Sequence, residues 1–181
     1  MGKLYITRHG QTVWNVEGKV CGATDIELTE LGHKQACELG EYIKNNSDIH
    51  IDEIVASPLK RAENTARHIA EATGIPMHTE ERIREQNFGK YEGGGRRDED
   101  FLEAKRGFVN SFDGGESMLR VAQRVYNLLD EIKNDKDKTY LIVAHNGIAR
   151  IIHSYFYDMS NEEFANHSMK NCELLEYDFG N

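Results

Sequence analysis

The sequence has few cysteines and prolines, no long apolar run and no excess of positive charge. Its three cysteines are odd in number and include no CxxC pair, which argues against a disulfide framework or a zinc site. With two prolines and no linker-like stretch, we expect residues 1–181 to form one domain. No apolar run approaches the length of a membrane span, and the N-terminus enters a strand-like segment without a signal peptide, so the sequence predicts a cytoplasmic protein.

The net charge of −9 limits the classes of ligand. Binding to a nucleic-acid backbone requires a basic surface, so this balance argues against nucleic acid as a partner. It does not exclude a small anionic substrate, because a few local arginines can hold a phosphate within an acidic protein. The expected partner is therefore a small molecule rather than a nucleic acid or a membrane, and the oligomeric state stays open.

Strand-like and helix-like segments alternate along the chain, an order typical of layered α/β folds. The expected strands span residues 3–7, 53–56, 139–144 and 172–179, with a weaker one within 77–83. The expected helices span residues 29–45, 57–74, 101–112, 117–134 and 148–156. Thr29 and Ser57 are the expected N-caps of the first two helices, and Pro58 would occupy the first turn of the second.

Two histidines directly follow two of the expected strands. His9 comes after residues 3–7 and His145 after residues 139–144, and a glycine follows each within two residues. In an open parallel sheet the carboxyl ends of the strands share one crevice, where ligands bind. Two histidines that reach this crevice together with Arg8 indicate chemistry on an anion.

The block from Arg8 to Asn15 contains groups suited to phosphoryl transfer. Neutral imidazole is a good nucleophile toward phosphorus, so His9 is a candidate for covalent catalysis. Arg8 supplies a fork for phosphate oxygens, Gly10 lets the backbone approach a ligand, and Asn15 offers an amide donor. The alternative is a strand end followed by an ordinary polar turn.

Three later residues are further candidates. Arg61 lies near the start of the helix expected from residue 57, where a cation opposes the helix dipole, so it indicates a bound anion rather than a solvated surface charge. Glu85 is a candidate general acid and Glu92 its rival, and the alternative for both is a solvated loop carboxylate. His145 is a candidate donor to phosphoryl oxygens, and its alternative is a histidine that closes a strand.

Taken in order, these blocks resemble the histidine phosphatase superfamily, also called the phosphoglycerate-mutase-like family. The resemblance spans Lys3 to about Ile152 and includes Gly114-Gly115-Glu116-Ser117 before the long helix. Its other motifs are Arg8-His9-Gly10-Gln11-Thr12, Ser57-Pro58-Leu59-Lys60-Arg61, Glu85-Gln86-Asn87-Phe88-Gly89 and Val143-Ala144-His145-Asn146-Gly147. The implied fold is a three-layer α/β/α sandwich around a mostly parallel sheet, and no metal or organic cofactor is implied.

The resemblance also implies roles for individual residues. His9 would become phosphorylated, and Glu85 would be first the proton donor and then the base that activates water. The phosphate pocket would be formed by Arg8, Arg61 and His145, with Asn15 beside it.

One position departs from the family pattern. Asn146 stands where the family usually has the first glycine after the second histidine. Asparagine tolerates a left-handed backbone better than most residues, so we expect the turn to survive. The Asn146 side chain could also reach the phosphate.

The motif around Glu85 distinguishes two branches of the family. At this motif the mutase sequences are similar to Glu-Arg-His-Tyr-Gly, whereas this chain has Glu85-Gln86-Asn87-Phe88-Gly89. Mutases also have longer insertions between the glutamate and the second histidine, and in this chain that segment is short. The run from Phe88 to Gly93 is similar to the broad-specificity phosphatase branch. We therefore predict a histidine acid-type phosphatase that hydrolyses a small phosphorylated metabolite through a phosphohistidine intermediate.

Two other functions and the choice of substrate stay open. The chain could be a cofactor-dependent phosphoglycerate mutase, or a phosphate-ester binding module without turnover. Arg96 and Arg97 follow three glycines. They either bind an acidic group of the substrate or belong to a solvated loop.

Overall fold

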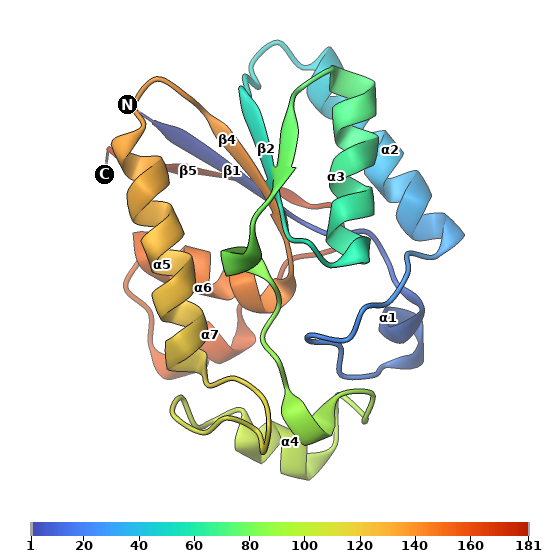
Figure 1. The fold of residues 1–181 in the computed structure, drawn as a ribbon, viewed down its shortest axis with the longest axis vertical. Coiled ribbons are helices and arrows are strands. Elements are labelled where there is room, and N and C mark those ends of the chain that lie inside the picture. The colour runs from blue at the N-terminus through green and yellow to red at the C-terminus, as the bar shows by residue number, and fades with distance from the viewer. Residues whose placement is uncertain (1, 181) are drawn as a thin grey trace.

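The computed structural model describes residues 2–180, and its centre is a five-stranded sheet (Figure 1). Along the sheet the strands follow the order β3-β2-β4-β1-β5. Their bounds are β1 Lys3–Arg8, β2 Glu53–Ala56, β3 Met77–Thr79, β4 Tyr140–Ala144 and β5 Leu174–Asp178. The first four in this order pair in parallel, and β5 pairs antiparallel with β1. The predicted mostly parallel sheet is confirmed.

Helices cover both faces of this sheet. Their bounds are α1 Val13–Glu17, α2 Glu30–Asn45, α3 Lys60–Thr73, α4 Glu99–Ala104, α5 Met118–Asn134, α6 Asn146–Phe156 and α7 Asn161–Asn166, with 3-10 turns at Glu81–Ile83 and Gly89–Tyr91. Because side chains alternate along a strand, Leu141 and Val143 of β4 pack with α2 and α3, whereas Ile142 and Ala144 pack with α5 and α6. The predicted three-layer sandwich is confirmed. Within residues 2–180, no helix is both long and apolar enough to cross a membrane.

The two predicted helix caps have different outcomes. Thr29 caps α2 as expected. The start predicted at Ser57-Pro58 is wrong, because α3 begins at Lys60. The Ser57 hydroxyl pairs instead with the His145 ring, 2.7 Å away, since a buried imidazole requires a polar partner.

The segment between α4 and α5 is less helical than predicted. A helix is expected over residues 101–112, but α4 ends at Ala104. Phe112 and Asp113 have φ angles of 56° and 54°, a left-handed backbone that a helix does not contain. This bend places the Phe112 ring 5.4 Å from the Phe88 ring in a small aromatic cluster, so the burial of rings outweighs local helix propensity.

Several element boundaries also differ from the sequence prediction. The last strand begins at Leu174 rather than at Cys172, whose φ of 56° is left-handed. The short helices α1 and α7 were not expected. Each begins with a capping box, Thr12 with Asn15 and Ser160 with Glu163. That spacing is a start signal visible in the sequence.

Candidate active site

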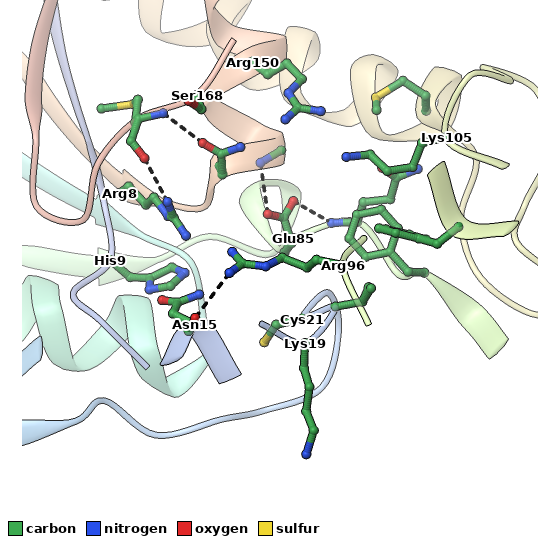
Figure 2. A pocket seen from close by; sticks show the side chains of 18 of the residues that line it. Arg8, His9, Asn15, Lys19, Cys21, Glu85, Arg96, Lys105, Arg150 and Ser168 are labelled. Carbon is green, nitrogen blue, oxygen red and sulfur yellow. Dashed lines mark hydrogen bonds between the residues drawn. The ribbon is translucent and has the colours of Figure 1, made fainter. Parts of the chain in front are cut away.

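A cavity of about 410 Å³ opens at the carboxyl ends of β1 and β4 (Figure 2). Its wall includes five of the seven predicted site residues, namely Arg8, His9, Asn15, Glu85 and Asn146. The other two, Arg61 and His145, are buried behind this wall. The wall also contains basic residues that sequence reasoning missed, namely Lys19, Lys105, Arg150 and Lys170.

His9 lines the cavity and is 4% exposed. Its Nδ1 lies 2.7 Å from the Gly10 carbonyl oxygen, which can only accept, so Nδ1 carries the proton. The lone pair is therefore on Nε2, which is the atom that the predicted attack on phosphorus would use. Burial lowers the pKa of His9 well below its ordinary value of 6.5, and the charges of Arg61 and Arg8 lower it further. The ring is neutral at physiological pH.

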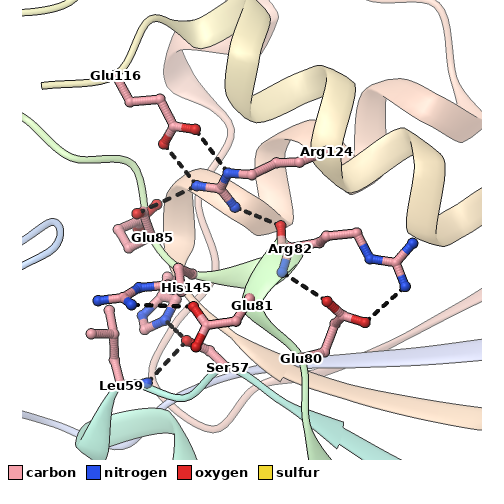
Figure 3. A network of polar contacts seen from close by, with 10 residues as sticks. Ser57, Leu59, Glu80, Glu81, Arg82, Glu85, Glu116, Arg124 and His145 are labelled. Atoms are coloured by element: carbon pink, nitrogen blue, oxygen red, sulfur yellow. Dashed lines mark hydrogen bonds and ion pairs between the residues drawn. The ribbon is translucent and has the colours of Figure 1, made fainter.

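The second histidine lies beside the first, with the ring centroids of His9 and His145 5.3 Å apart. Arg61 Nε donates to His145 Nδ1 over a distance of 3.2 Å, so the proton of His145 is on Nε2. This proton points to the Ser57 hydroxyl, 2.7 Å away (Figure 3). Burial, followed by the charge of Arg61, lowers the pKa of His145 well below 6.5. Both ring nitrogens have protein partners, and donation from His145 to a phosphoryl group stays a prediction.

Arg61 on α3 is fully buried. Besides His145, its guanidinium donates to the carbonyl oxygens of Thr24 (2.8 Å) and Gly22 (2.7 Å). These contacts use three of its five N–H groups. Arg61 thus orients His145 and places a positive charge behind His9, while its direct contact with phosphate stays a prediction.

The two candidate carboxylates have different surroundings. Glu92 accepts hydrogen bonds from the backbone N–H groups of residues 22–24, so it anchors that loop. Glu85 is 7% exposed and lines the cavity. Its carboxylate accepts hydrogen bonds from the N–H groups of Gln86 and Gly147, and each donor–acceptor distance is 3.0 Å. A Cβ at position 147 would collide with this carboxylate, which explains the glycine there. Of the two, Glu85 is the one on the cavity wall, and its role in proton transfer stays a prediction.

An arginine that sequence reasoning missed holds the backbone of Glu85 (Figure 3). Arg124 on α5 donates to the carbonyl oxygens of Arg82 (2.5 Å) and Glu85 (3.5 Å). Its guanidinium also binds the Glu116 carboxylate through two hydrogen bonds, each 2.9 Å long. Glu116 belongs to the Gly-Gly-Glu-Ser block noted above, which was the signal for this clamp in the sequence.

Met169, far along the chain, connects two residues of the site. Its N–H donates to Asn146 Oδ1 (2.9 Å), and its carbonyl accepts from Arg8 Nη1 (2.8 Å). The left-handed turn expected at Asn146 is wrong, because α6 begins at this residue directly after His145. The side-chain oxygen of Asn146 is used within the protein, and its contact with phosphate stays a prediction.

Asn15 and Arg96 form the wall near His9 (Figure 2). Asn15 Oδ1 accepts from the Thr12 N–H (3.1 Å), so its amide NH₂ group is the end left for a ligand. Arg96 Nη2 donates to the Asn15 carbonyl over 3.2 Å. Arg97 is exposed and lies outside the cavity wall, so the two arginines after the glycines have different positions.

Comparison with known proteins decides the family, because residues 4–181 match the sequence profile of the histidine phosphatase superfamily (branch 1). The chain belongs to this superfamily. It is 34% identical to a candidate phosphoserine phosphatase 2 of Hydrogenobacter thermophilus, over 97% of this chain and 89% of that protein. It is 30% identical to a probable phosphoglycerate mutase of Yersinia pestis, over 99% and 86%. The structure of mycobacterial glucosyl-3-phosphoglycerate phosphatase matches with a TM-score of 0.83 and 27% identity, over 96% and 88%.

The buried histidines should make the stability of this histidine phosphatase depend on pH. His9 and His145 have pKa values well below 6.5 in the folded protein, whereas histidines in the unfolded chain titrate near 6.5. Below that pH the unfolded state binds more protons, so the free energy of unfolding should fall as the pH decreases from about 7 to about 5. His9→Asn should weaken this dependence.

Urea denaturation at several pH values measures the effect. His50→Gln is the control, because the side chain of His50 is 83% exposed, and it should keep the wild-type pH dependence. Identical pH dependence in His9→Asn and His50→Gln would contradict the assigned burial of a neutral His9.

Proposed function

We propose that this protein is a histidine acid-type phosphatase that hydrolyses small phosphomonoesters through a phosphohistidine on His9. The observation that carries the proposal is the state of the His9 ring. Its Nδ1 donates a hydrogen bond to the Gly10 carbonyl, and its unprotonated Nε2 is available to a ligand in a cavity lined by many basic residues. Such a ring is both oriented and neutral, as nucleophilic attack on phosphorus requires. Phosphatases among the named relatives and structural neighbours support the proposal.

In the first step the phosphate oxygens bind Arg8 and Asn15. Arg8 is held in place by its hydrogen bond to the Met169 carbonyl, and its remaining N–H groups can donate to the phosphate oxygens. His9 Nε2 forms a bond to phosphorus while the bond from phosphorus to the alcohol oxygen breaks. Glu85, in its acid form, gives its proton to the leaving oxygen.

In the second step water releases the phosphoryl group. The Glu85 carboxylate takes a proton from water, the water oxygen bonds to phosphorus, and the electron pair of the P–N bond returns to His9. Inorganic phosphate leaves and Glu85 again holds its proton. Because one carboxylate serves both steps, its position must stay fixed, and the Gly147 N–H and the Arg124 clamp support this.

Arg61 and His145 act from behind the nucleophile. The charge of Arg61 disfavours protonation of His9 and adds to the positive potential that attracts a dianionic phosphate. The His145 ring, held by Arg61 and Ser57, packs beside His9 and limits its movement. Both residues therefore preserve the geometry and the neutral form of His9.

A phosphoglycerate mutase is the second candidate, since one relative is named so. A mutase would pass the phosphoryl group to a hydroxyl of a phosphoglycerate instead of to water. Incubation with 3-phosphoglycerate should release inorganic phosphate faster than it forms 2-phosphoglycerate. Faster formation of 2-phosphoglycerate would assign a mutase, and the absence of both products and of a phosphoenzyme would assign a binding module.

His9→Asn should lower kcat on a phosphomonoester by at least ~10³-fold, because the covalent route is lost. Brief reaction with a ³²P-labelled ester, stopped in alkaline denaturant, should leave label on wild-type protein and none on the variant. The control His50→Gln changes an exposed histidine and should keep both turnover and label. Near-native turnover in His9→Asn would contradict the mechanism.

Glu85→Gln should lower kcat by ~10²- to 10⁴-fold on an alkyl phosphate, because proton transfer in both steps is lost. With p-nitrophenyl phosphate, whose leaving group needs no proton, the variant should still give a rapid burst of about one p-nitrophenol per active site before turnover slows. Rapid-mixing absorbance measures the burst. Glu41→Gln, at an exposed position of α2, is the control, and full steady turnover of the Glu85 variant on both substrates would contradict the role of Glu85.

A further inference from the structure

The peptide group between His9 and Gly10 is bound at both ends by side chains from distant segments. The Gly10 N–H donates to Oγ1 of Thr65 on α3 over a distance of 3.0 Å. The His9 carbonyl oxygen accepts from Nδ2 of Asn171, 2.8 Å away. Asn171 lies three residues before β5, which pairs with β1. Both contacts therefore act on the chain at the point where it leaves β1 beside the cavity.

Thr65 is fully buried, and its hydroxyl has one partner as donor and another as acceptor. It donates to the Arg61 carbonyl over 2.7 Å, so its lone pairs are left for the Gly10 N–H. The bond to Arg61 is the back-bond that threonine commonly makes within a helix. The bond to Gly10 is not explained by α3, and it connects that helix to the segment that carries His9.

The backbone at residue 10 has little restraint of its own. A Cβ at this position would collide with the backbone of Gly32 at the start of α2, so packing requires a glycine. Glycine populates more backbone angles than other residues, which would let the Gly10 carbonyl turn away from His9. That carbonyl accepts from His9 Nδ1 and thereby keeps the lone pair on Nε2. The Thr65 bond restrains the same glycine through its N–H group.

We propose that Thr65 and Asn171 are positioning residues for His9, because they hold the peptide group that keeps the Gly10 carbonyl on His9 Nδ1. The inference rests on the proposed function, in which the lone pair of His9 Nε2 attacks phosphorus. Neither Thr65 nor Asn171 belongs to the cavity wall, so each acts through the nucleophile's backbone instead of touching the substrate.

Asn171 has a second contact that Thr65 lacks. Its Nδ2 lies 3.4 Å from Asn15 Oδ1, which also accepts from the Thr12 N–H. With both bonds on its oxygen, the Asn15 amide presents its NH₂ group to the cavity. Loss of Asn171 should therefore weaken phosphate binding as well as attack by His9, whereas loss of Thr65 should affect the attack alone.

Thr65→Val keeps the shape of the side chain and removes the acceptor, which leaves the buried Gly10 N–H without a partner. The variant should form the phosphoenzyme about tenfold more slowly, while the inhibition constant of inorganic phosphate stays at the wild-type value. Rapid quenching with a ³²P-labelled ester measures the first quantity and competitive inhibition the second. Thr65→Ser keeps the hydroxyl and should restore the rate.

Thr73 provides a matched control on the same helix. Its Oγ1 also donates four residues back, to the Ile69 carbonyl (2.7 Å), and also accepts from a backbone N–H, that of Ile75 (3.3 Å). Thr73→Val should therefore cause a similar loss within α3 and keep the wild-type rate of phosphoenzyme formation. Equal rates in Thr65→Val and Thr73→Val would contradict the proposal.

Asn171→Ala should slow phosphoenzyme formation and also raise the inhibition constant of inorganic phosphate about threefold, because the Asn15 amide loses one of its two restraints. Asn45→Ala, at an exposed position of α2, is the control and should change neither quantity. Wild-type values of both quantities in Asn171→Ala would contradict its positioning role.

The ¹⁵N chemical shifts of the His9 ring test the positioning without turnover. Wild-type protein should carry the proton on Nδ1, and Thr65→Val should show a mixture of both tautomers, with the signals assigned by their loss in His9→Asn. A proton on Nδ1 alone in both proteins would overturn this inference and leave the phosphatase intact. If Thr65→Val fails to fold, Asn171→Ala provides the same comparison.

The outcomes separate this inference from the proposed function. Absence of hydrolysis and of a phosphoenzyme in wild-type protein would overturn the proposed function itself. The comparison of tautomers would still decide whether Thr65 and Asn171 hold the ring of His9 in one form.

Discussion

The buried guanidinium of Arg61 is the contact on which the site depends. It joins the loop at Gly22 and Thr24 to His145, which follows β4. A hydrogen bond to a charged group contributes about 1.5–3 kcal/mol, and Arg61 makes three of them, so these segments cannot separate without a large loss of stability. Burial lowers the pKa of both neighbouring imidazoles, and the charge of Arg61 lowers it further, so both rings are neutral where they pack side by side.

The start of α6 provides a second constraint, because it serves several parts of the cavity at once. His145 is its N-cap, the Gly147 N–H binds the Glu85 carboxylate, and Arg150 faces the same cavity one turn later. A helix that begins directly at the carboxyl end of a buried strand holds these groups rigidly. The start of α6 thereby keeps His9, which packs beside His145, and Glu85 in one fixed relation.

Much of this arrangement was predictable because it depends on local patterns. Alternating strands and helices indicated the layers, and the positions of His9 and His145 after two strands indicated a shared edge. The failures occurred where long-range contacts overrode local signals. Ser57-Pro58 has the pattern of a helix start, yet Ser57 is needed as a partner of His145. Residues after Ala104 leave the helix because the Phe112 ring is buried in an aromatic cluster.

The sequence by itself determined the sheet and the family and indicated the groups proposed to perform the chemistry, since these follow from periodicity and from short motifs. Only the tertiary structure placed Glu85 on the cavity wall and Glu92 on the loop of residues 22–24, and put Arg61 and His145 behind that wall. The physical reason is that burial and charge pairing depend on segments far apart in the chain. A local sequence pattern does not predict which distant backbone N–H group or carboxylate a side chain will contact.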